Sequence, residues 1–76
     1  MESKKIDLKI GFFLRKQRLQ KELSQEFMAN QFNISRNTYQ AWEKGEVYFS
    51  MSKISLICEI YEIEMIDFWR VVFLGS

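Results

Sequence analysis

The 76-residue sequence has no histidine, no proline and a single cysteine, Cys58. Without imidazoles or a second thiol it contains neither a zinc-ligand set nor a disulfide framework. A lone cysteine in a small domain is expected to be buried as ordinary packing. No stretch approaches the roughly 18 apolar residues of a membrane span, and the charged N-terminus leads into no apolar signal segment. We therefore expect a soluble cytoplasmic protein without a metal or another cofactor.

Residues suited to catalysis are equally scarce. The chain has three glycines, and they form no phosphate-binding loop. The acids of the C-terminal half are scattered along one helical segment, and no histidine is present to act as a base beside them. We expect that the protein is not an enzyme.

The net charge is only +1, but it is unevenly distributed. Residues 1–44 carry nine Lys and Arg against five Asp and Glu, whereas residues 45–76 carry two against five. One basic and one acidic half are typical of a molecule with one face for a polyanion. Solvated helix faces would produce the same imbalance, so the charge distribution does not distinguish the two interpretations.

Apolar residues are abundant, at 47% of the chain, and their spacing is helical rather than alternating. We expect one domain over residues 1–76, with its core at about 8–70. The run Val71–Leu74 has strand propensity, which leaves the end of the last helix open. The predicted helices span about residues 7–21, 25–32, 36–43, a segment from a cap at Ser50 or Ser52 to a break near 62–64, and 65–73.

The second and third predicted helices are joined by a tight turn. Ser24 and Ser35 are good N-cap residues, because a hydroxyl accepts a hydrogen bond from an unpaired amide in the first turn. Asn33 suits a helix end, because asparagine tolerates the left-handed conformation. Two residues separate the end of one helix from the cap of the next, so the helices must cross steeply. This is the geometry of a helix-turn-helix, at about residues 24–45.

The third helix carries side chains of the types that read DNA in the major groove. Tyr39 and Trp42, three residues apart, mark its inner face. The polar residues fall elsewhere and should face outward. The expected DNA contacts are Arg36 with guanine, Asn37 and Gln40 with adenine, Ser35 or Thr38 with a phosphate or a thymine methyl, and Gln25 with a phosphate.

These residues carry a resemblance to a known family. The sequence reads Leu23-Ser24-Gln25-Glu26, Met28-Ala29, Phe32, Ile34-Ser35-Arg36, Thr38-Tyr39, Trp42-Glu43 and Gly45. That is similar to the run L-S-Q-E-x-h-A-x-x-h-x-h-S-R-x-T-h-x-x-W-E-x-G, in which h is apolar. Over Ile10 to Phe68 the chain thus resembles the DNA-binding domain of the Cro and cI phage repressors, the Xre-type helix-turn-helix family. The resemblance implies an all-α, compact five-helix bundle with a lambda-repressor-like fold.

The resemblance also implies roles for individual residues. Arg18 and Glu43 match a pair that forms an internal salt bridge, so both are interpreted as structural. Ala41 matches a groove-facing position at which it offers only a methyl group. The positions that match DNA contacts are Gln25 at the backbone, Arg36, Asn37 and Gln40 at bases, and Lys44 at a phosphate.

The sequence departs from the family pattern at two kinds of position. Glu22, Asn33 and Glu62 stand where relatives often have glycine, so the helix ends at 22 and 62 are expected to differ. Residues 47–49, Val-Tyr-Phe, replace a loop that is usually polar or basic. This removes a common source of phosphate contacts.

The chain has more large apolar residues than one small core needs. Phe12, Phe13 and Phe27 are interpreted either as core residues or as part of a second contact surface. The last helix is apolar nearly all round, which is typical of an interface. The predicted homodimer contacts are Trp69, Val72 and Phe73, with Tyr48 and Phe49 as possible additions.

The sequence therefore predicts a nucleoid-associated, sequence-specific regulator that binds double-stranded DNA and represses transcription as a homodimer on a palindromic operator. A phage-type repressor, a restriction–modification controller and an autoregulating antitoxin all fit. The alternative is a helix-turn-helix used as a protein-interaction module, with a toxin or an antirepressor as its partner. An apolar 47–49 loop and a low net charge favour that alternative.

Overall fold

A computed structural model describes residues 2–74, and this range folds into helices without a strand. The helices are α1 (Glu2–Gln20), α2 (Gln25–Phe32), α3 (Arg36–Glu43), α4 (Met51–Tyr61) and α5 (Met65–Leu74). The prediction of an all-α, five-helix fold is confirmed. Val71–Leu74 continue α5, so their strand propensity does not decide their conformation.

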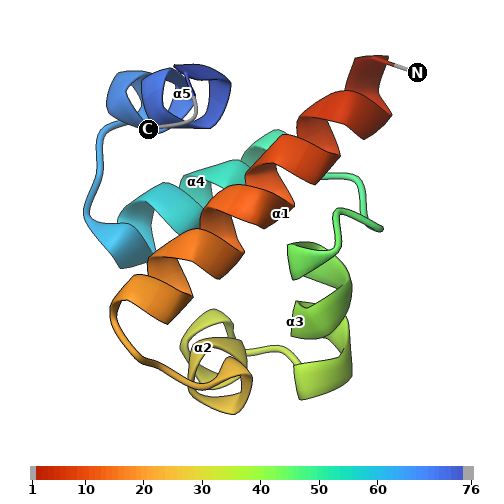
Figure 1. Ribbon diagram of the computed structural model, residues 1–76, viewed down its shortest axis with the longest axis vertical. Coiled ribbons are helices and arrows are strands. Elements are labelled where there is room, and N and C mark those ends of the chain that lie inside the picture. Colours follow the sequence, from red (N-terminus) through yellow and green to blue (C-terminus); the bar gives the residue numbers. More distant parts are fainter. Residues whose placement is uncertain (1, 75–76) are drawn as a thin grey trace.

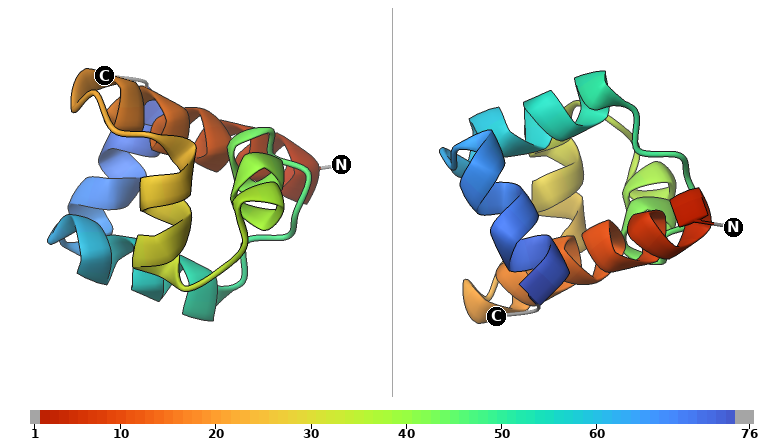
Figure 2. Two further views of the ribbon diagram at one scale, coloured as in Figure 1. Left: turned by 90° about the horizontal axis from the view of Figure 1, so that it is seen from below. Right: turned by 90° about the horizontal axis from the view of Figure 1, so that it is seen from above.

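The helices enclose the core from all sides. In Figure 1, α1 runs diagonally across the front from the N-terminus at upper right, with α5 above it at the left and α2 and α3 below it. Seen end-on, α1 and α4 form two opposite sides, α5 and α3 form the other two, and α2 closes one end (Figure 2). α1 packs on both α3 and α5, and α2 packs on both α3 and α4. α1 thus joins the helix-turn-helix region to the C-terminal helix.

α1 begins at Glu2, about five residues earlier than the apolar pattern predicts. Lys4 and Lys5 are exposed and contribute nothing to an apolar stripe, so periodicity misses this first part. One polar contact anchors it. The backbone N–H of Phe49 donates to the buried Asp7 carboxylate at 3.1 Å, which joins α1 to the loop before α4.

Aromatic rings make up much of the core. Phe32 packs against Tyr39 and Trp42 of α3, at ring-centroid distances of 6.0 and 5.2 Å. Phe13 of α1 meets Phe68 of α5 edge to face at 5.2 Å. The predicted inner face of the third helix is confirmed. The buried apolar side chains are Ile10, Phe13, Leu14, Met28, Ala29, Phe32, Tyr39, Trp42, Phe49, Ile54, Ile57, Cys58, Phe68 and Val72.

Three helices end in the same left-handed turn although none of them ends on glycine. Glu22, Asn33 and Glu62 have φ values of 56°, 60° and 54°. After each, the next backbone N–H closes the turn by donating to a carbonyl five residues earlier, for example Ile63 N to Cys58 O at 3.0 Å. The helix ends expected to differ at 22 and 62 therefore keep the turn, at a cost of about 1 kcal/mol for each glutamate.

Glycine is needed where α1 passes the C-terminal end of α3. A Cβ atom at Gly11 would lie 2.6 Å from the backbone carbonyl oxygens of Trp42 and Glu43. A Cβ atom at Gly45, whose φ is +70°, would lie 2.6 Å from the Cα atom of Leu8. The two segments therefore touch backbone to backbone, and a side chain at either position would force them apart.

Candidate nucleic-acid interface

The caps of α2 and α3 fix the two short helices and the turn between them. Ser24 Oγ accepts from the backbone N–H of Phe27 at 3.0 Å, and Ser35 Oγ accepts from that of Thr38 at 3.1 Å. Ser35 Oγ also donates to Thr38 Oγ1 at 2.9 Å. Both hydroxyls expected at DNA are exposed. The Ser35 hydroxyl accepts in the cap and donates its proton to Thr38, whereas the Thr38 hydroxyl keeps its own proton for an acceptor such as a phosphate.

The polar residues of α3 share its outer face. Tyr39, Trp42 and Glu43 are buried. Gln40 and Ala41 are half-buried at the margin of the outer face. The exposed residues at the start, on the body and just past the end of α3 are Ser35, Arg36, Asn37, Thr38 and Lys44. α3 thus presents a row of hydrogen-bonding side chains on a helix whose opposite side is fixed in the core.

A buried ion pair joins α1 to α3. Arg18 Nε donates to Glu43 Oε2 at 2.6 Å, and a second guanidinium nitrogen donates to Oε1 at 3.2 Å. The Glu43 side chain is 3% exposed and that of Arg18 is 11% exposed. The third donor of Arg18 reaches the Leu23 carbonyl at 2.9 Å, in the turn before α2. One guanidinium group therefore ties α1, the turn and α3 together.

Electrostatics keep this pair charged. Burial alone would raise the pKa of Glu43, but hydrogen bonding, from Arg18 above all, outweighs burial, and the pKa lies below its ordinary value. The hydrogen bond that Arg18 donates to Glu43 raises the pKa of Arg18. Both groups therefore remain ionised at neutral pH, which gives the interior of the site a fixed carboxylate.

Gln25 connects the ion pair to the outer face of α3. Its Nε2 donates to Glu43 Oε1 at 3.1 Å, and its Oε1 accepts from Gln40 Nε2 at 3.0 Å. The sequence indicated Gln25 and Gln40 as separate DNA contacts, and it held no sign that they touch each other. The structure brings together four of the residues named from the sequence in one chain of hydrogen bonds: Arg18, Glu43, Gln25 and Gln40.

A polar hollow of about 500 Å³ opens beside the first turn of α2. Its lining residues are Arg15, Arg18, Ser24, Gln25, Glu26 and Arg36. Arg18 is paired with Glu43, whereas Arg15 and Arg36 are exposed. Guanidinium groups around a helix N-terminus attract anions such as phosphate. Arg15 was not predicted from the sequence, in which its position one turn before Arg18 was the only indication.

The expected dimer contacts do not share one environment. Val72 is only 5% exposed and packs in the core, so the prediction that it contacts a second copy was wrong. Phe49, named as a possible addition, is 4% exposed and meets Trp42 edge to face at 5.7 Å. Trp69 is half-buried and stacks on Phe73, whose ring is half-exposed, at 5.5 Å. Burial in the monomer removes Val72 and Phe49 from a surface role, and Tyr48 stays exposed.

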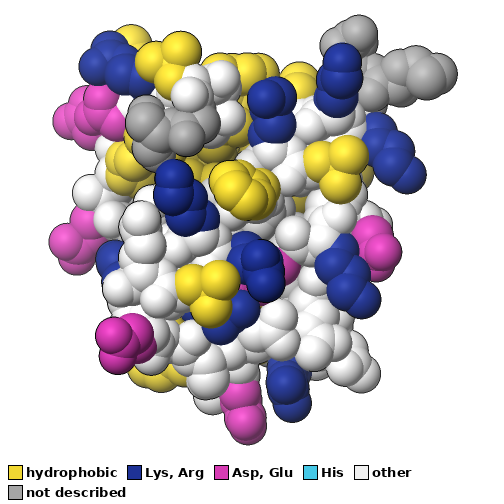
Figure 3. All heavy atoms as spheres, viewed as in Figure 1, with side chains coloured by type: hydrophobic (Ala, Val, Ile, Leu, Met, Phe, Trp, Pro, Cys, Tyr) yellow, Lys and Arg dark blue, Asp and Glu magenta, His cyan; other side chains and the backbone are white. Residues whose placement is uncertain are grey.

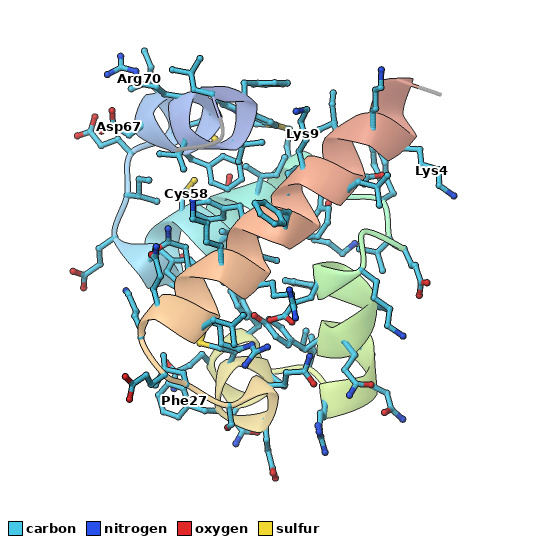
Figure 4. All side chains as sticks on the ribbon, in the orientation of Figure 1. Lys4, Lys9, Phe27, Cys58, Asp67 and Arg70 are labelled. Atoms are coloured by element: carbon cyan, nitrogen blue, oxygen red, sulfur yellow. The ribbon has the colours of Figure 1, made fainter. Side chains whose placement is uncertain are left out.

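The surplus phenylalanines divide between core and surface. Phe13 is buried, whereas Phe12 on α1 and Phe27 on α2 are exposed. Figure 3 shows Lys and Arg side chains along the α1 face, with separate apolar side chains between them. Phe27 lies at the α2 end of the molecule, far from α5 (Figure 4). The exposed apolar residues are thus spread over several faces.

Cys58 packs as the sequence predicts. It is buried on α4, 4.0 Å from the Met65 sulfur, and burial raises the pKa of its thiol. Within residues 2–74, no group of three His, Cys, Asp or Glu side chains is placed to hold a metal ion. None of the described helices is both long and apolar enough to cross a membrane.

Comparison with known proteins gives one result. Residues 14–68, more than half of the chain, match a protein-family model described as helix-turn-helix. The matched segment contains α2, α3, the Arg18–Glu43 pair and the polar hollow. No curated protein and no solved structure gives a significant match to the chain.

Proposed function

Because the chain belongs to the Cro/C1-type (Xre) helix-turn-helix family, we propose that it represses transcription as a homodimer on palindromic operator DNA. The family binds DNA and is not catalytic, so DNA is the partner on which the proposal depends. The family match confirms the family membership that was predicted from the motif between Leu23 and Gly45. The observation that carries the proposal is the outer face of α3, where exposed hydrogen-bonding side chains stand on a helix held by Arg18 and Glu43.

In the proposed complex, α3 lies in the major groove with its N-terminal turn toward the bases. Arg36 pairs with guanine, while Asn37 and Gln40 meet adenine. Ser35 and Thr38 meet a phosphate or a thymine methyl, and Lys44 holds a phosphate at the other end of the helix. Gln25 meets a phosphate at the polar hollow, at which Arg15 adds positive charge.

The homodimer is proposed because of the apolar surface of α5. Ile66, Phe73 and Leu74 are exposed, and the Phe73 ring stacks on Trp69. These three exposed apolar side chains on one terminal helix supply apolar area of the kind that interfaces bury. A two-fold contact there would hold two copies of α3 about 34 Å apart, one turn of DNA, so that the pair reads a palindrome. Such a protein would act at the nucleoid.

A selection from random DNA duplexes tests the proposal, because it returns the site, its spacing and its symmetry together. We expect two inverted half-sites about 10 base pairs apart, centre to centre. Affinity should fall as salt rises, with a slope of about −0.9 per neutralised phosphate. Enrichment of no duplex, or binding that salt leaves unchanged, would contradict the proposal.

A protein-interaction module is the second candidate, and the exposed apolar side chains outside α5 favour it. Phe12, Phe27, Tyr48 and Met51 lie on other elements and need not take part in one dimer contact. An antitoxin that caps a toxin and regulates its own operon would use both kinds of surface. Binding of a co-encoded protein without any duplex binding would favour this candidate over the repressor.

A further inference from the structure

We infer that Glu43 and Gln25 set the direction of the Gln40 side-chain amide, so that Gln40 selects a base with an amino group in the major groove, adenine above all. The inference rests on the proposed function, because it assigns base preference within the same DNA site. It makes Glu43 and Gln25 positioning residues for recognition, in addition to the stabilising role of the ion pair.

The chain of hydrogen bonds has a direction because it starts from a carboxylate. Glu43 is ionised and can only accept, so the atom that Gln25 turns toward it must be the nitrogen. The oxygen of the Gln25 amide is then the atom that faces Gln40. That oxygen can only accept, so Gln40 must turn its nitrogen toward Gln25.

Gln40 is therefore left with its oxygen directed away from Gln25. Among the hydrogen bonds of residues 2–74, the Gln40 oxygen takes part in none. Gln40 is half-buried at the margin of the outer face of α3 and follows the buried Tyr39. Turning the amide over would bring two oxygens together and lose the hydrogen bond to Gln25, so this orientation is disfavoured about two- to tenfold.

The free groups of Gln40 complement one base best. Its oxygen accepts from an amino group, which adenine and cytosine present in the major groove. Its second N–H is free for the N7 atom of adenine, which cytosine lacks. Guanine and thymine present carbonyl oxygens, which would face the Gln40 oxygen without a proton between them. Adenine is therefore preferred, cytosine is second, and the other two bases are disfavoured.

The experiment compares base preferences of variants by selection from random duplexes. Gln40→Ala first identifies the base pair that Gln40 reads, because the variant should lose its base preference at that base pair. Gln25→Leu then removes the link to Glu43 while leaving both Arg18 hydrogen bonds to Glu43 in place. Gln31→Leu is the matched control, because Gln31 lies on α2 beside Lys21 and Tyr61, outside the hydrogen-bonded chain. Thermal unfolding verifies that all three variants fold.

We expect the wild type and Gln31→Leu to favour adenine over guanine by about five- to one-hundred-fold at this position. Gln25→Leu should reduce that ratio by about two- to tenfold, whatever it does to overall affinity. A guanine or thymine preference in the wild type would overturn the inference. An unchanged ratio in Gln25→Leu, or no position that depends on Gln40, would overturn it while leaving the proposed function intact.

A second measurement needs no DNA, and it separates failure of the inferred hydrogen-bonded chain from failure of the proposed DNA binding. In ¹⁵N-labelled protein, the side-chain NH₂ resonances of Gln40 should shift in Gln25→Leu and stay in place in Gln31→Leu. Resonances that do not move in either variant would overturn the inference. Shifted resonances in a protein that selects no duplex would show that the hydrogen-bonded chain exists, and would overturn both the proposed function and the base preference assigned to Gln40.

Discussion

The helix-turn-helix region and α5 expose surfaces of opposite character. On α3 the exposed side chains are polar, the helix is capped by Ser35, and its inner side carries a buried ion pair. On α5 the exposed side chains Ile66, Phe73 and Leu74 are apolar. The one ion pair described on α5, Asp67 with Arg70, is solvent-exposed at 3.9 Å (Figure 4).

The difference teaches what each kind of contact requires from the fold. Hydrogen bonds to bases are directional, so the proposed DNA contacts require that α3 be held at a fixed angle and its side chains in fixed orientations. An apolar contact depends on area removed from water and has little directional preference. Accordingly, the inner side of α3 is held by hydrogen bonds from Arg18 and Gln25 to the buried Glu43, whereas α5 contributes apolar area. Four predictions test this division, from the largest expected effect to the smallest.

Glu43→Ala should destabilise the fold by about 3 kcal/mol, because it leaves the largely buried Arg18 guanidinium without its carboxylate. Chemical denaturation followed by circular dichroism measures the change. The matched control is Asp67→Ala on α5, where an exposed pair is lost and the change should stay within about 0.5 kcal/mol. Equal losses of stability in the two variants would mean that the buried ion pair at α3 stabilises the fold no more than the exposed pair on α5.

Arg36→Ala should cost about 2 kcal/mol of binding to the selected duplex and relax preference at one base pair only. Arg36 is exposed, so the unfolding curve should be unchanged. Lys44→Ala is the control, since loss of a phosphate contact weakens all duplexes alike and lowers the salt slope by about one unit. If Arg36→Ala also weakens all duplexes equally, Arg36 holds a phosphate and its assignment to guanine is wrong.

Phe73→Glu should weaken self-association by about tenfold or more, because a charge replaces a half-exposed ring at the proposed contact. Sedimentation over a range of concentrations measures the effect, and the helical circular-dichroism signal should persist. Phe12→Glu changes an exposed phenylalanine on α1 in the same way and should leave association unaltered. Equal effects of the two substitutions would place the contact on α1 as well as on α5.

Glu62→Gly should stabilise the fold by about 1 kcal/mol, because glycine adopts the left-handed conformation before α5 without a steric cost. Chemical denaturation measures this gain. Glu59→Gly, at an exposed position inside α4, should instead lose about 1 kcal/mol. A loss in both variants would mean that the Glu62 side chain contributes more than its backbone conformation costs.

The fold could be predicted best where short-range chemistry decides it. The predicted ranges 25–32 and 36–43 coincide with α2 and α3, because Ser24, Asn33 and Ser35 mark their ends. The start of α1 was missed because its first turns are polar. The environments of Val72 and Phe49 could not be predicted, because a segment apolar on every side does not reveal which residues face the core.

The candidate site was predictable as a set of residues but not as a network. Residue types and a family resemblance named Arg18, Glu43, Gln25 and Gln40 one at a time. The two short contacts of Gln25 depend on the crossing angle of α2 and α3 and on rotamers, which spacing along the chain does not encode. Arg15 lines the hollow because the fold brings α1 near the start of α2, and this placement is not encoded in spacing along the chain either.

The contact at Gly11 and Gly45 also bears on how the proposed DNA preference could change in this protein. Because backbone meets backbone there, the tilt of α3 against α1 does not depend on the size of any side chain on the outer face of α3. Residues such as Arg36 and Asn37 can therefore be exchanged without altering the angle at which the helix is presented. A side chain at either glycine would disturb this angle, whereas exposed residues such as Arg36 and Asn37 lie outside the contact, so under the proposed function α3 is the part of the chain to vary in a redesign of DNA preference.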